Sequence, residues 1–467
     1  CGKSTLGRTI LQLYHQTYGR TMYYGRSLDD LAPKYVIDTV KNLKSRRAKL
    51  HELEQKRDKL EAEYAKLSET EQYAKHTELD TARKLAEDAL LDITKIVGGF
   101  LVVDDLDPVI AAYSKDYGIA RKISALEEKR QALQVDVDDA QYAKKTAEEA
   151  GKSEKSGQLE KAQEKLKQCD DQIAALRQQL DAGRQEIEAL RQPYASDPEF
   201  QKYEAYRDDG IDLARLEYNE MRRLRSDMQL IFQDPYSSLN PRMSVGQIIS
   251  EGMQAHNMIK KKDARMQEMV LKIMDDCGLA PYFLHRFPHQ FSGGQRQRIG
   301  IARALILNPD FIVADEPISA LDVSIQAQII NLFSDLRDDR GVTFLFISHD
   351  LGVVEHLCDD VAVMYLGRIV EMGDADTVIQ HPMHPYTQAL ISNCSSIDPD
   401  ADMPVISIEG EPPSPVDPGP GCYFADRCFK ACDKCRKSYP PMVTMPDGRQ
   451  ISCFFAQTIE EEEKHAD

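Results

Sequence analysis

The stretch FSGGQRQR at residues 291–298 is the most informative part of the sequence. Its Ser-Gly-Gly opens a helix-like run, and free backbone N–H groups at a helix start can bind an anion. Glycine at this position lets a phosphate approach the backbone closely. The apolar run FIVA at 311–314 follows and leads into Asp315 and Glu316. An anion-binding turn, a helix and a buried strand ending in two carboxylates together predict a nucleotide-binding α/β fold.

Gly2, Lys3, Ser4 and Thr5 supply a second phosphate-binding element. They match the end of the loop G-x-x-x-x-G-K-[ST], in which the lysine contacts the β- and γ-phosphates and the hydroxyl binds Mg²⁺. The first half of this loop is not in the sequence. We therefore expect it to precede Cys1 in a longer chain.

The two carboxylates at the end of the predicted strand complete this site. Asp315 is predicted to hold Mg²⁺ through water. Glu316 is predicted to polarise an attacking water molecule. An Asp-Glu pair at a strand end is by itself also compatible with a helix N-cap and a solvated neighbour, so the prediction depends on the other motifs.

Composition limits the class of protein. A length of 467 residues suggests about three folding units. The chain has 77 Asp plus Glu against 59 Lys plus Arg, a net charge of −18, which argues against binding nucleic acid through phosphate contacts. Apolar runs such as TFLFI at 343–347 are far shorter than the roughly 20 residues that a membrane helix needs. We expect no nucleic acid partner and no membrane span.

Residues 36–220 differ in composition from the rest, being rich in Lys, Glu, Gln, Ala and Leu. Apolar residues recur every seven positions over 43–67 and again over 159–190, with a more apolar stretch after 98–99 between these runs. The pattern predicts a long antiparallel coiled-coil hairpin inserted into a globular domain. Solvated helices without a supercoil are the alternative. Such a hairpin could be a docking arm for a regulatory partner or an insertion with no partner.

Ordinary α/β patterning resumes at about residue 221. Short runs rich in β-branched and aromatic residues at 228–232, 311–315 and 343–348 alternate with helical stretches. This alternation favours a parallel sheet covered by helices. The run at 360–373 has a Gly-Arg turn between two strand-like pieces and predicts a β-hairpin.

These motifs together resemble the ATPase subunits of ABC transporters. Five of them occur in the order typical of that family: GKST, LIFQDP, FSGGQRQR, ADEP followed by SALD, and a His after FIS. The resemblance implies a P-loop ATPase with a RecA-like core and a helical subdomain. It also implies that the chain binds ATP and Mg²⁺ and hydrolyses ATP.

The resemblance assigns a role to each matched residue. Gln233 corresponds to the Q-loop glutamine, which senses Mg²⁺, water and the transmembrane partner. Glu316 corresponds to the catalytic glutamate and His349 to the switch histidine. The residues implied to contact ATP match the Walker A end, the signature, the Walker B aspartate and the D-loop: Gly2, Lys3, Ser4, Thr5, Ser292, Gly293, Gly294, Gln295, Asp315 and Asp322. The implied Mg²⁺ ligands are Ser4, Gln233 and Asp315.

Longer matches narrow the resemblance to one group of ABC transporters. QDPYSSLNPRMSV at 233–245, SALDVSIQAQIINL at 319–332 and HPYTQALI at 384–391 resemble the F-type ATPases of oligopeptide and dipeptide importers. The resemblance implies a heterodimer with a second ABC ATPase, two permease subunits and an extracytoplasmic peptide-binding protein, at the cytoplasmic face of the cell membrane. The expected parts are the truncated start of the ATPase domain (1–35), the insertion (36–220), the rest of the ATPase domain (221–385) and a C-terminal extension (386–467).

A cysteine cluster characterises the C-terminal extension. Its spacing is C-x5-C-x6-C-x17-C, with Cys432 as an extra thiol, and its members are Cys422, Cys428, Cys435 and Cys453. In a cytosolic protein such a cluster more often binds a metal than forms disulfides. Peptide importers share this pattern, and the resemblance to some of them implies a [4Fe-4S] cluster. Zinc bound by four thiolates and free structural thiols are the alternatives.

An ATPase of DNA repair or chromosome maintenance is the alternative function. Such proteins share the ABC engine, and some carry a long coiled coil between the halves of the nucleotide site. Here, however, the insertion precedes Gln233, no C-x-x-C hook lies at its tip, and the net charge is acidic.

Overall fold

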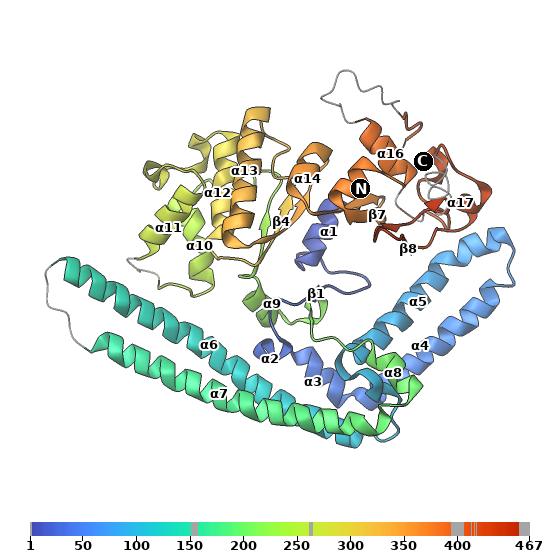
Figure 1. The fold of residues 1–467 in the computed structure, drawn as a ribbon, viewed down its shortest axis with the longest axis horizontal. Helices are drawn as coiled ribbons and strands as arrows, with labels where there is room; N and C mark the ends of the chain where they lie inside the picture. The colour runs from blue at the N-terminus through green and yellow to red at the C-terminus, as the bar shows by residue number, and fades with distance from the viewer. Residues whose placement is uncertain are drawn as a thin grey trace. The chain divides into compact units, whose positions relative to one another are not determined.

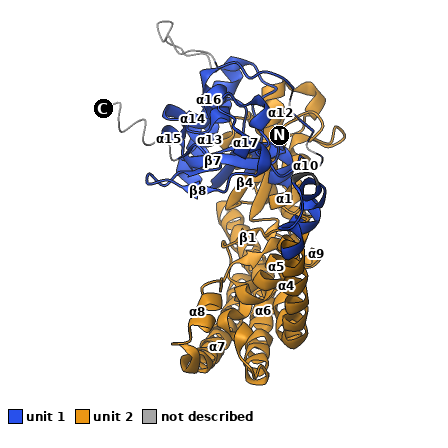
Figure 2. Cartoon of the chain, turned by 90° about the vertical axis from the view of Figure 1, so that its right-hand side faces the viewer, with its two compact units in different colours: residues 1–8, 62–80, 313–467 blue, residues 9–61, 81–312 orange. Residues whose placement is uncertain are grey.

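A computed structural model describes residues 2–150, 157–260, 265–393, 406–411, 413–414, 416 and 418–456. The chain divides into two compact units (Figure 2). Unit 1 comprises residues 1–8, 62–80 and 313–467, and unit 2 comprises residues 9–61 and 81–312. No helix in the described ranges has both the length and the apolar character needed to cross a membrane.

Unit 1 contains the strands that carry the predicted carboxylates. The expected strands at 311–315 and 343–348 are present as β4 and β5, which are neighbours in one sheet. A second sheet has the order β6-β7-β9-β8. The elements that lie wholly or mainly in unit 1 are α1 (Lys3–Ile10), β4 (Phe311–Asp315), α13 (Val323–Arg340), β5 (Thr343–Ile347), α14 (Leu351–Leu357), β6 (Asp360–Tyr365), β7 (Arg368–Asp374), α15 (Ala375–Gln380), α16 (Pro385–Ser392), α17 (Asp433–Lys437), β8 (Val443–Thr444) and β9 (Gln450–Ile451).

The predicted hairpin at 360–373 is confirmed by the antiparallel pairing of β6 with β7. Its turn is Leu366–Gly367, one residue earlier than the Gly-Arg turn expected. Both residues have positive φ, 44° and 79°, as a type I′ turn requires at its two central positions. Strand β9 then pairs with β7 on its other edge, so the C-terminal extension and the hairpin share one sheet.

Unit 2 is mostly helical. The remaining strand of the three expected from the sequence, at 228–232, is present in unit 2 as β3. The helices and strands that lie wholly or mainly in unit 2 are β1 (Met22–Tyr23), α2 (Leu28–Leu31), α3 (Lys34–Lys41), α4 (Leu43–Tyr64), α5 (Glu69–Val97), α6 (Asp107–Glu149), α7 (Gln158–Arg191), α8 (Pro198–Glu204), β2 (Ile211–Asp212), α9 (Tyr218–Leu224), β3 (Met228–Ile231), α10 (Val245–Ala255), α11 (Arg265–Asp276) and α12 (Gly293–Leu305).

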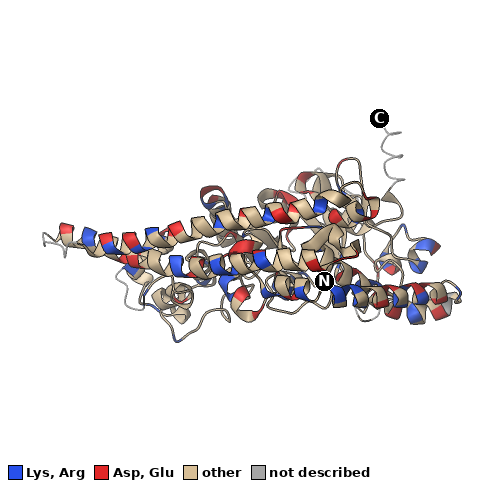
Figure 3. Cartoon of the chain, turned by 90° about the horizontal axis from the view of Figure 1, so that it is seen from below, with Lys and Arg blue, Asp and Glu red and all other residues tan. Residues whose placement is uncertain are grey.

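The segment predicted as one hairpin contains four long helices, which corrects the prediction. Helices α6 and α7 pack along each other (Figure 1). Arg83 of α5 pairs with Glu61 of α4 at 2.6 Å. Lys and Arg residues are interspersed with Asp and Glu residues along the long helices (Figure 3), as expected for solvated surfaces. The second heptad run, on α7, therefore packs mainly against α6.

The apolar stretch after Gly98 and Gly99 is a packed core and not the tip of a hairpin. Phe100 is fully buried, and its ring lies edge-on to Phe200 with centroids 5.7 Å apart. The guanidinium of Arg191 lies 4.4 Å from the Phe100 ring centroid. A Cβ on Gly99 would lie 2.6 Å from Phe200, so this close approach requires glycine.

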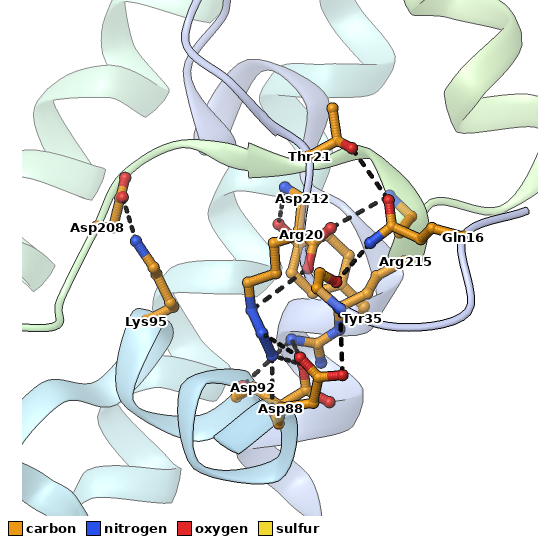
Figure 4. A network of polar contacts seen from close by, with 12 residues as sticks. Gln16, Arg20, Thr21, Tyr35, Asp88, Asp92, Lys95, Asp208, Asp212 and Arg215 are labelled. Atoms are coloured by element: carbon orange, nitrogen blue, oxygen red, sulfur yellow. Dashed lines mark hydrogen bonds and ion pairs between the residues drawn. The ribbon is translucent and has the colours of Figure 1, made fainter. Parts of the chain in front are cut away.

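A network of ion pairs in unit 2 joins the chain before the inserted helices to the chain after them (Figure 4). Strands β1 and β2 pair antiparallel, with Tyr23 opposite Ile211. Arg20, just before β1, lies 2.6 Å from Asp92 of α5 and 3.8 Å from Asp212 of β2. Its side chain is only 9% exposed. The network therefore connects β1 and β2, the two strands that flank the inserted helices, to α5.

Candidate functional site

The start of α1 and the end of β4 bring two predicted Mg²⁺ ligands into contact in unit 1. Ser4 Oγ donates a hydrogen bond of 2.6 Å to Asp315 Oδ1. Asp315 is 1% exposed. Lys3 Nζ donates to the main-chain oxygen of Ser348 at 2.9 Å. A buried carboxylate and a hydroxyl are hard oxygen donors of the kind that Mg²⁺ prefers, so these residues fit that ion.

Close packing of α1 on the sheet sets this geometry. Gly7 is buried one turn after Lys3 and Ser4. A Cβ at this position would lie 2.9 Å from side-chain carbons of both Val313 on β4 and Ile347 on β5. The missing side chain therefore lets the helix lie directly against both strands.

Glu316 and His349 are the second pair of predicted site residues that the structure brings together in unit 1. His349 Nδ1 lies 3.6 Å from Glu316 Oε2. The Glu316 side chain is 18% exposed and that of His349 is 66% exposed. Glu316 has φ of 45°, a left-handed conformation that costs a non-glycine residue about 1–2 kcal/mol. Its N–H donates to Ile347 O at 3.0 Å, so a bond to β5 holds the strained residue.

The remaining predicted residues of unit 1 lie at the ends of helices. Gly2 has φ of 89°, and its carbonyl accepts from Leu6 N at 2.9 Å. Thr5 is exposed on the first turn of α1. Asp322 is the exposed N-cap residue of α13. These positions leave all three residues at the surface of unit 1.

The signature residues belong to unit 2, where they begin α12. Ser292 is the N-cap, and its Oγ accepts from Gln295 N at 3.4 Å, while Gln295 Oε1 accepts from Ser292 N at 3.2 Å. This capping box means that the Gln295 side chain stabilises the helix start. Gly293 is half-buried and Gly294 is buried. Ser292 itself is exposed at the helix start.

Gln233 also belongs to unit 2. It is exposed and lies two residues after the end of β3. Tyr236, three residues further on, is 58% exposed. The guanidinium of Arg296 on α12 lies 3.9 Å from the Tyr236 ring centroid. This cation–π contact connects the segment that carries Gln233 to the signature helix.

The four predicted cysteine ligands line one small cavity in unit 1, together with His384. Burial raises the pKa of the Cys422 and Cys453 thiols to about 11. The described residues include no group of three or more His, Cys, Asp or Glu side chains arranged to hold a metal ion. The four thiols therefore share a cavity and are the type of ligand that a cluster uses, but their described positions are not arranged around a metal ion.

Sequence reasoning missed two groups near the phosphate-site residues. Arg8 Nη2 lies 3.5 Å from Asp315 Oδ2. The spacing of four from Ser4 to Arg8, one helical turn, could have placed both on one face of α1. The Ser348 carbonyl, which accepts from Lys3, carries no sequence signal because every residue has one.

The comparisons with known protein families agree with this geometry. The ABC transporter family matches residues 198–319, and the C-terminal region of the oligopeptide/dipeptide transporter family matches residues 370–435. The first range contains Gln233, the signature and Glu316. The second contains Cys432 and three of the four cysteines that line the cavity, Cys422, Cys428 and Cys435, whereas Cys453 lies beyond it.

Three relatives show the same relationship over longer ranges. A peptide ABC transporter ATP-binding protein of Sinorhizobium fredii is 51% identical over 52% of this chain and 69% of its own length. An oligopeptide transport ATP-binding protein of Bacillus subtilis is 48% identical over 55% and 78%. A dipeptide transport ATP-binding protein of Haemophilus influenzae is 49% identical over 49% and 70%.

The P-loop site and these matches define an ABC ATPase. Within that class, the chain belongs to the family of ATP-binding proteins of oligopeptide and dipeptide ABC transporters.

Proposed function

We propose that this chain hydrolyses ATP to power the import of oligopeptides or dipeptides through an ABC transporter. The observation that carries the proposal is the contact of Ser4 with Asp315, next to Glu316 and His349, in a member of this family. The relatives are named as peptide transport proteins. That favours transport over the alternative of DNA repair or chromosome maintenance.

The residues of α1 and β4 would bind the triphosphate. Lys3 would exchange the Ser348 carbonyl for the β- and γ-phosphate oxygens, and Ser4 and Asp315 would hold Mg²⁺, Asp315 through water. Mg²⁺, when bound, neutralises charge on the phosphates. Arg8 lies beside Asp315 and offsets its buried charge. The N–H groups at the start of α1 add further donors to phosphate.

Glu316 would orient and polarise the attacking water. Its strained backbone is held by Ile347, which keeps the carboxylate at the end of β4. His349, at 3.6 Å from that carboxylate, would contact the γ-phosphate and sense its release. Water attack forms a new P–O bond as the bond to ADP breaks, and the proton passes to bulk solvent.

The unit 2 residues would act on a second nucleotide and on the membrane partner. Ser292, Gly293 and Gly294 would contact the γ-phosphate of ATP held by the opposite subunit, with Gln295 beside them. Asp322 of unit 1 would line the same interface. Gln233 would report the state of the site to the permease. These roles follow the family and imply a heterodimer with a second ABC ATPase.

The chain would act at the cytoplasmic face of the membrane, with two permease subunits and an extracytoplasmic peptide-binding protein. Purification of the full-length chain from detergent-solubilised membranes tests this assembly. We expect the second ATPase, the permeases and the binding protein to co-purify. Recovery of soluble DNA-processing proteins without a permease would contradict it.

Glu316→Gln tests the catalytic proposal directly. The amide keeps the size of the side chain but cannot polarise water, so we expect ATP binding to persist and turnover to be lost. Glu355→Gln, a change on α14, is the control and should leave turnover intact. Normal turnover by Glu316→Gln would remove this residue from the proposed role.

For the cysteine cavity we propose a [4Fe-4S] cluster, with zinc as the alternative. The support is that Cys422, Cys428, Cys435 and Cys453 line one cavity. Protein purified without oxygen should show an absorbance band at about 400 nm, typical of such clusters, and reduction should remove this band. A colourless protein with one bound zinc would favour the alternative.

The long helices α4 to α7 would form an insertion within the ATPase domain, so that the ATPase domain consists of 1–35 and 221–385 and is followed by the extension at 386–467. The support is the pairing of β1 with β2, which brackets these helices. They would serve as an arm for a regulatory partner. Co-purification with and without this arm tests that role.

A further inference from the structure

A pair of cysteines lies at the edge of the four-thiol cavity. Cys432 and Cys435 have the spacing C-x-x-C, and their Sγ atoms are 3.6 Å apart. The N–H of Cys435 donates to the carbonyl of Cys432 at 3.0 Å. This single turn places residues three apart on the same side of the backbone, which brings the two thiols together.

The two thiols differ in access to solvent. Cys432 is exposed, whereas Cys435 is 7% exposed. Cys435 lines the cavity with Cys422, Cys428 and Cys453, and Cys432 does not. A reagent in solution can therefore reach Cys432 first, while the buried Cys435 lies 3.6 Å from the Cys432 sulfur.

We propose that Cys432 and Cys435 form a reversible redox site that exchanges with low-molecular-weight disulfides. This inference does not depend on ATP hydrolysis, and it applies to the protein without a bound cluster, because Cys435 is also one of the proposed cluster ligands. It assigns a function to Cys432, the thiol left over from the set of four. Oxidation of the pair would also remove Cys435 from that set.

The chemistry is two successive thiol–disulfide exchanges. The Cys432 thiolate attacks one sulfur of a disulfide R–S–S–R, forming a mixed disulfide and releasing R–S⁻. The Cys435 thiolate then attacks the Cys432 sulfur, forming the Cys432–Cys435 bond and releasing the second R–S⁻. The pair loses two electrons and the small disulfide gains them. The two protons of the original thiols pass to the released thiolates or to solvent.

Mass spectrometry of the full-length chain tests the proposal. The protein is equilibrated in glutathione buffers from fully reduced to fully oxidised, quenched with acid and alkylated with iodoacetamide. Residues 431–437 contain no cysteine besides this pair, and because trypsin also cleaves after Lys434, a Cys432–Cys435 bond is detected as two peptides of this segment joined by a disulfide. We expect this segment to lose two hydrogen atoms and both alkyl groups as the proportion of oxidised glutathione rises.

Three variants make the test specific. The Cys432→Ser variant should form no disulfide within residues 431–437, and its Cys435 should still be alkylated once the protein is unfolded. Cys435→Ser should trap glutathione on Cys432. Cys358→Ser, which changes a thiol outside the cavity, should oxidise at residues 431–437 as the unchanged protein does.

Two results would overturn the proposal. One is that Cys435 is found joined to Cys422, Cys428 or Cys453 in place of Cys432. The other is that residues 431–437 remain fully alkylated in the most oxidising buffer.

Discussion

Ser4 and Asp315 are separated by most of the sequence, yet Ser4 Oγ donates a 2.6 Å hydrogen bond to Asp315 Oδ1. Asp315 lies at the buried end of a strand, and Ser4 lies on the first turn of a helix packed against that strand. The hydroxyl and the carboxylate are thus prearranged to share one small cation.

Replacing Ser4 with Ala should weaken use of Mg²⁺ without unfolding the protein. The change removes one oxygen donor and the hydrogen bond that orients Asp315. We expect the Mg²⁺ concentration for half-maximal ATP hydrolysis to rise on the order of tenfold, with little change in melting temperature. Ser4→Thr keeps the hydroxyl and should restore the original Mg²⁺ dependence. An unchanged Mg²⁺ dependence in Ser4→Ala would contradict the assignment.

Replacing Gly7 with Ala should destabilise the contact of α1 with the sheet. The new Cβ would lie 2.9 Å from Val313 and Ile347, and such overpacking costs about 1–3 kcal/mol. Urea unfolding measures the loss. Gly118→Ala on α6 is the matched control, because no atom lies within 4 Å of its Cβ position, and there alanine should be stabilising. Equal effects at both positions would argue against tight packing at Gly7.

Replacing Arg20 with Met should destabilise unit 2 strongly. The change leaves Asp88, Asp92 and Asp212 without the guanidinium that they share. Removing one partner of a fully buried pair costs about 3–5 kcal/mol, which is an upper bound here because Asp88 and Asp92 are each 29% exposed. Urea unfolding followed by circular dichroism measures this. Lys44→Met breaks an ion pair in which both side chains are more than half exposed and should change stability little. A similar small effect for Arg20→Met would mean that the network contributes little.

Replacing Asp116 with Asn should change how stability depends on pH. Burial raises the pKa of Asp116 to about 6 from its ordinary value of 3.8, so the folded state favours the protonated carboxyl. The stability that the protonated Asp116 carboxyl contributes to the folded state is fully present below pH 3.8 and is lost as the pH rises through about 6. The uncharged Asn does not incur this loss.

We therefore expect melting temperatures of the Asn variant and the unchanged protein to be similar near pH 4 and to separate in favour of the variant by pH 7. Asp104→Asn, at an exposed position, is the control and should show no such separation. A constant difference across the pH range would contradict the raised pKa.

The short strands were predictable because their signal is local. The runs at 228–232, 311–315 and 343–348 are β-branched or aromatic and bounded by polar residues, and all three are strands. The same holds for the 360–373 hairpin, although the structure places both positive φ values at Leu366 and Gly367. A glycine indicates that a turn is present, but which two residues occupy the centre of the turn depends on how the two strands pair.

The arrangement of the long helices was not predictable in the same way. Heptads identify the buried face of a helix, and Ile173, Leu180 and Ile187 of α7 are indeed buried. They do not say which helix covers that face. The sequence therefore predicted one hairpin, whereas the partner of α7 is α6.

The candidate site was predicted in its residue types but not in its contacts. Motif spacing placed Lys3, Ser4, Asp315 and Glu316 in one site because each motif has a phosphate-binding or metal-binding chemistry. The ion pairs of Arg20 had no such signal, since its partners lie about 70 to 190 positions away in a chain with many charged residues.

Tyr23 lies opposite Ile211, so the segment between them begins and ends at one point. A segment whose ends are adjacent can be lengthened, exchanged or lost in a single genetic event without stretching any loop of its host. The pairing of β1 with β2 thus leaves the two ends of the segment that holds α2 to α8 side by side, whatever the length of that segment.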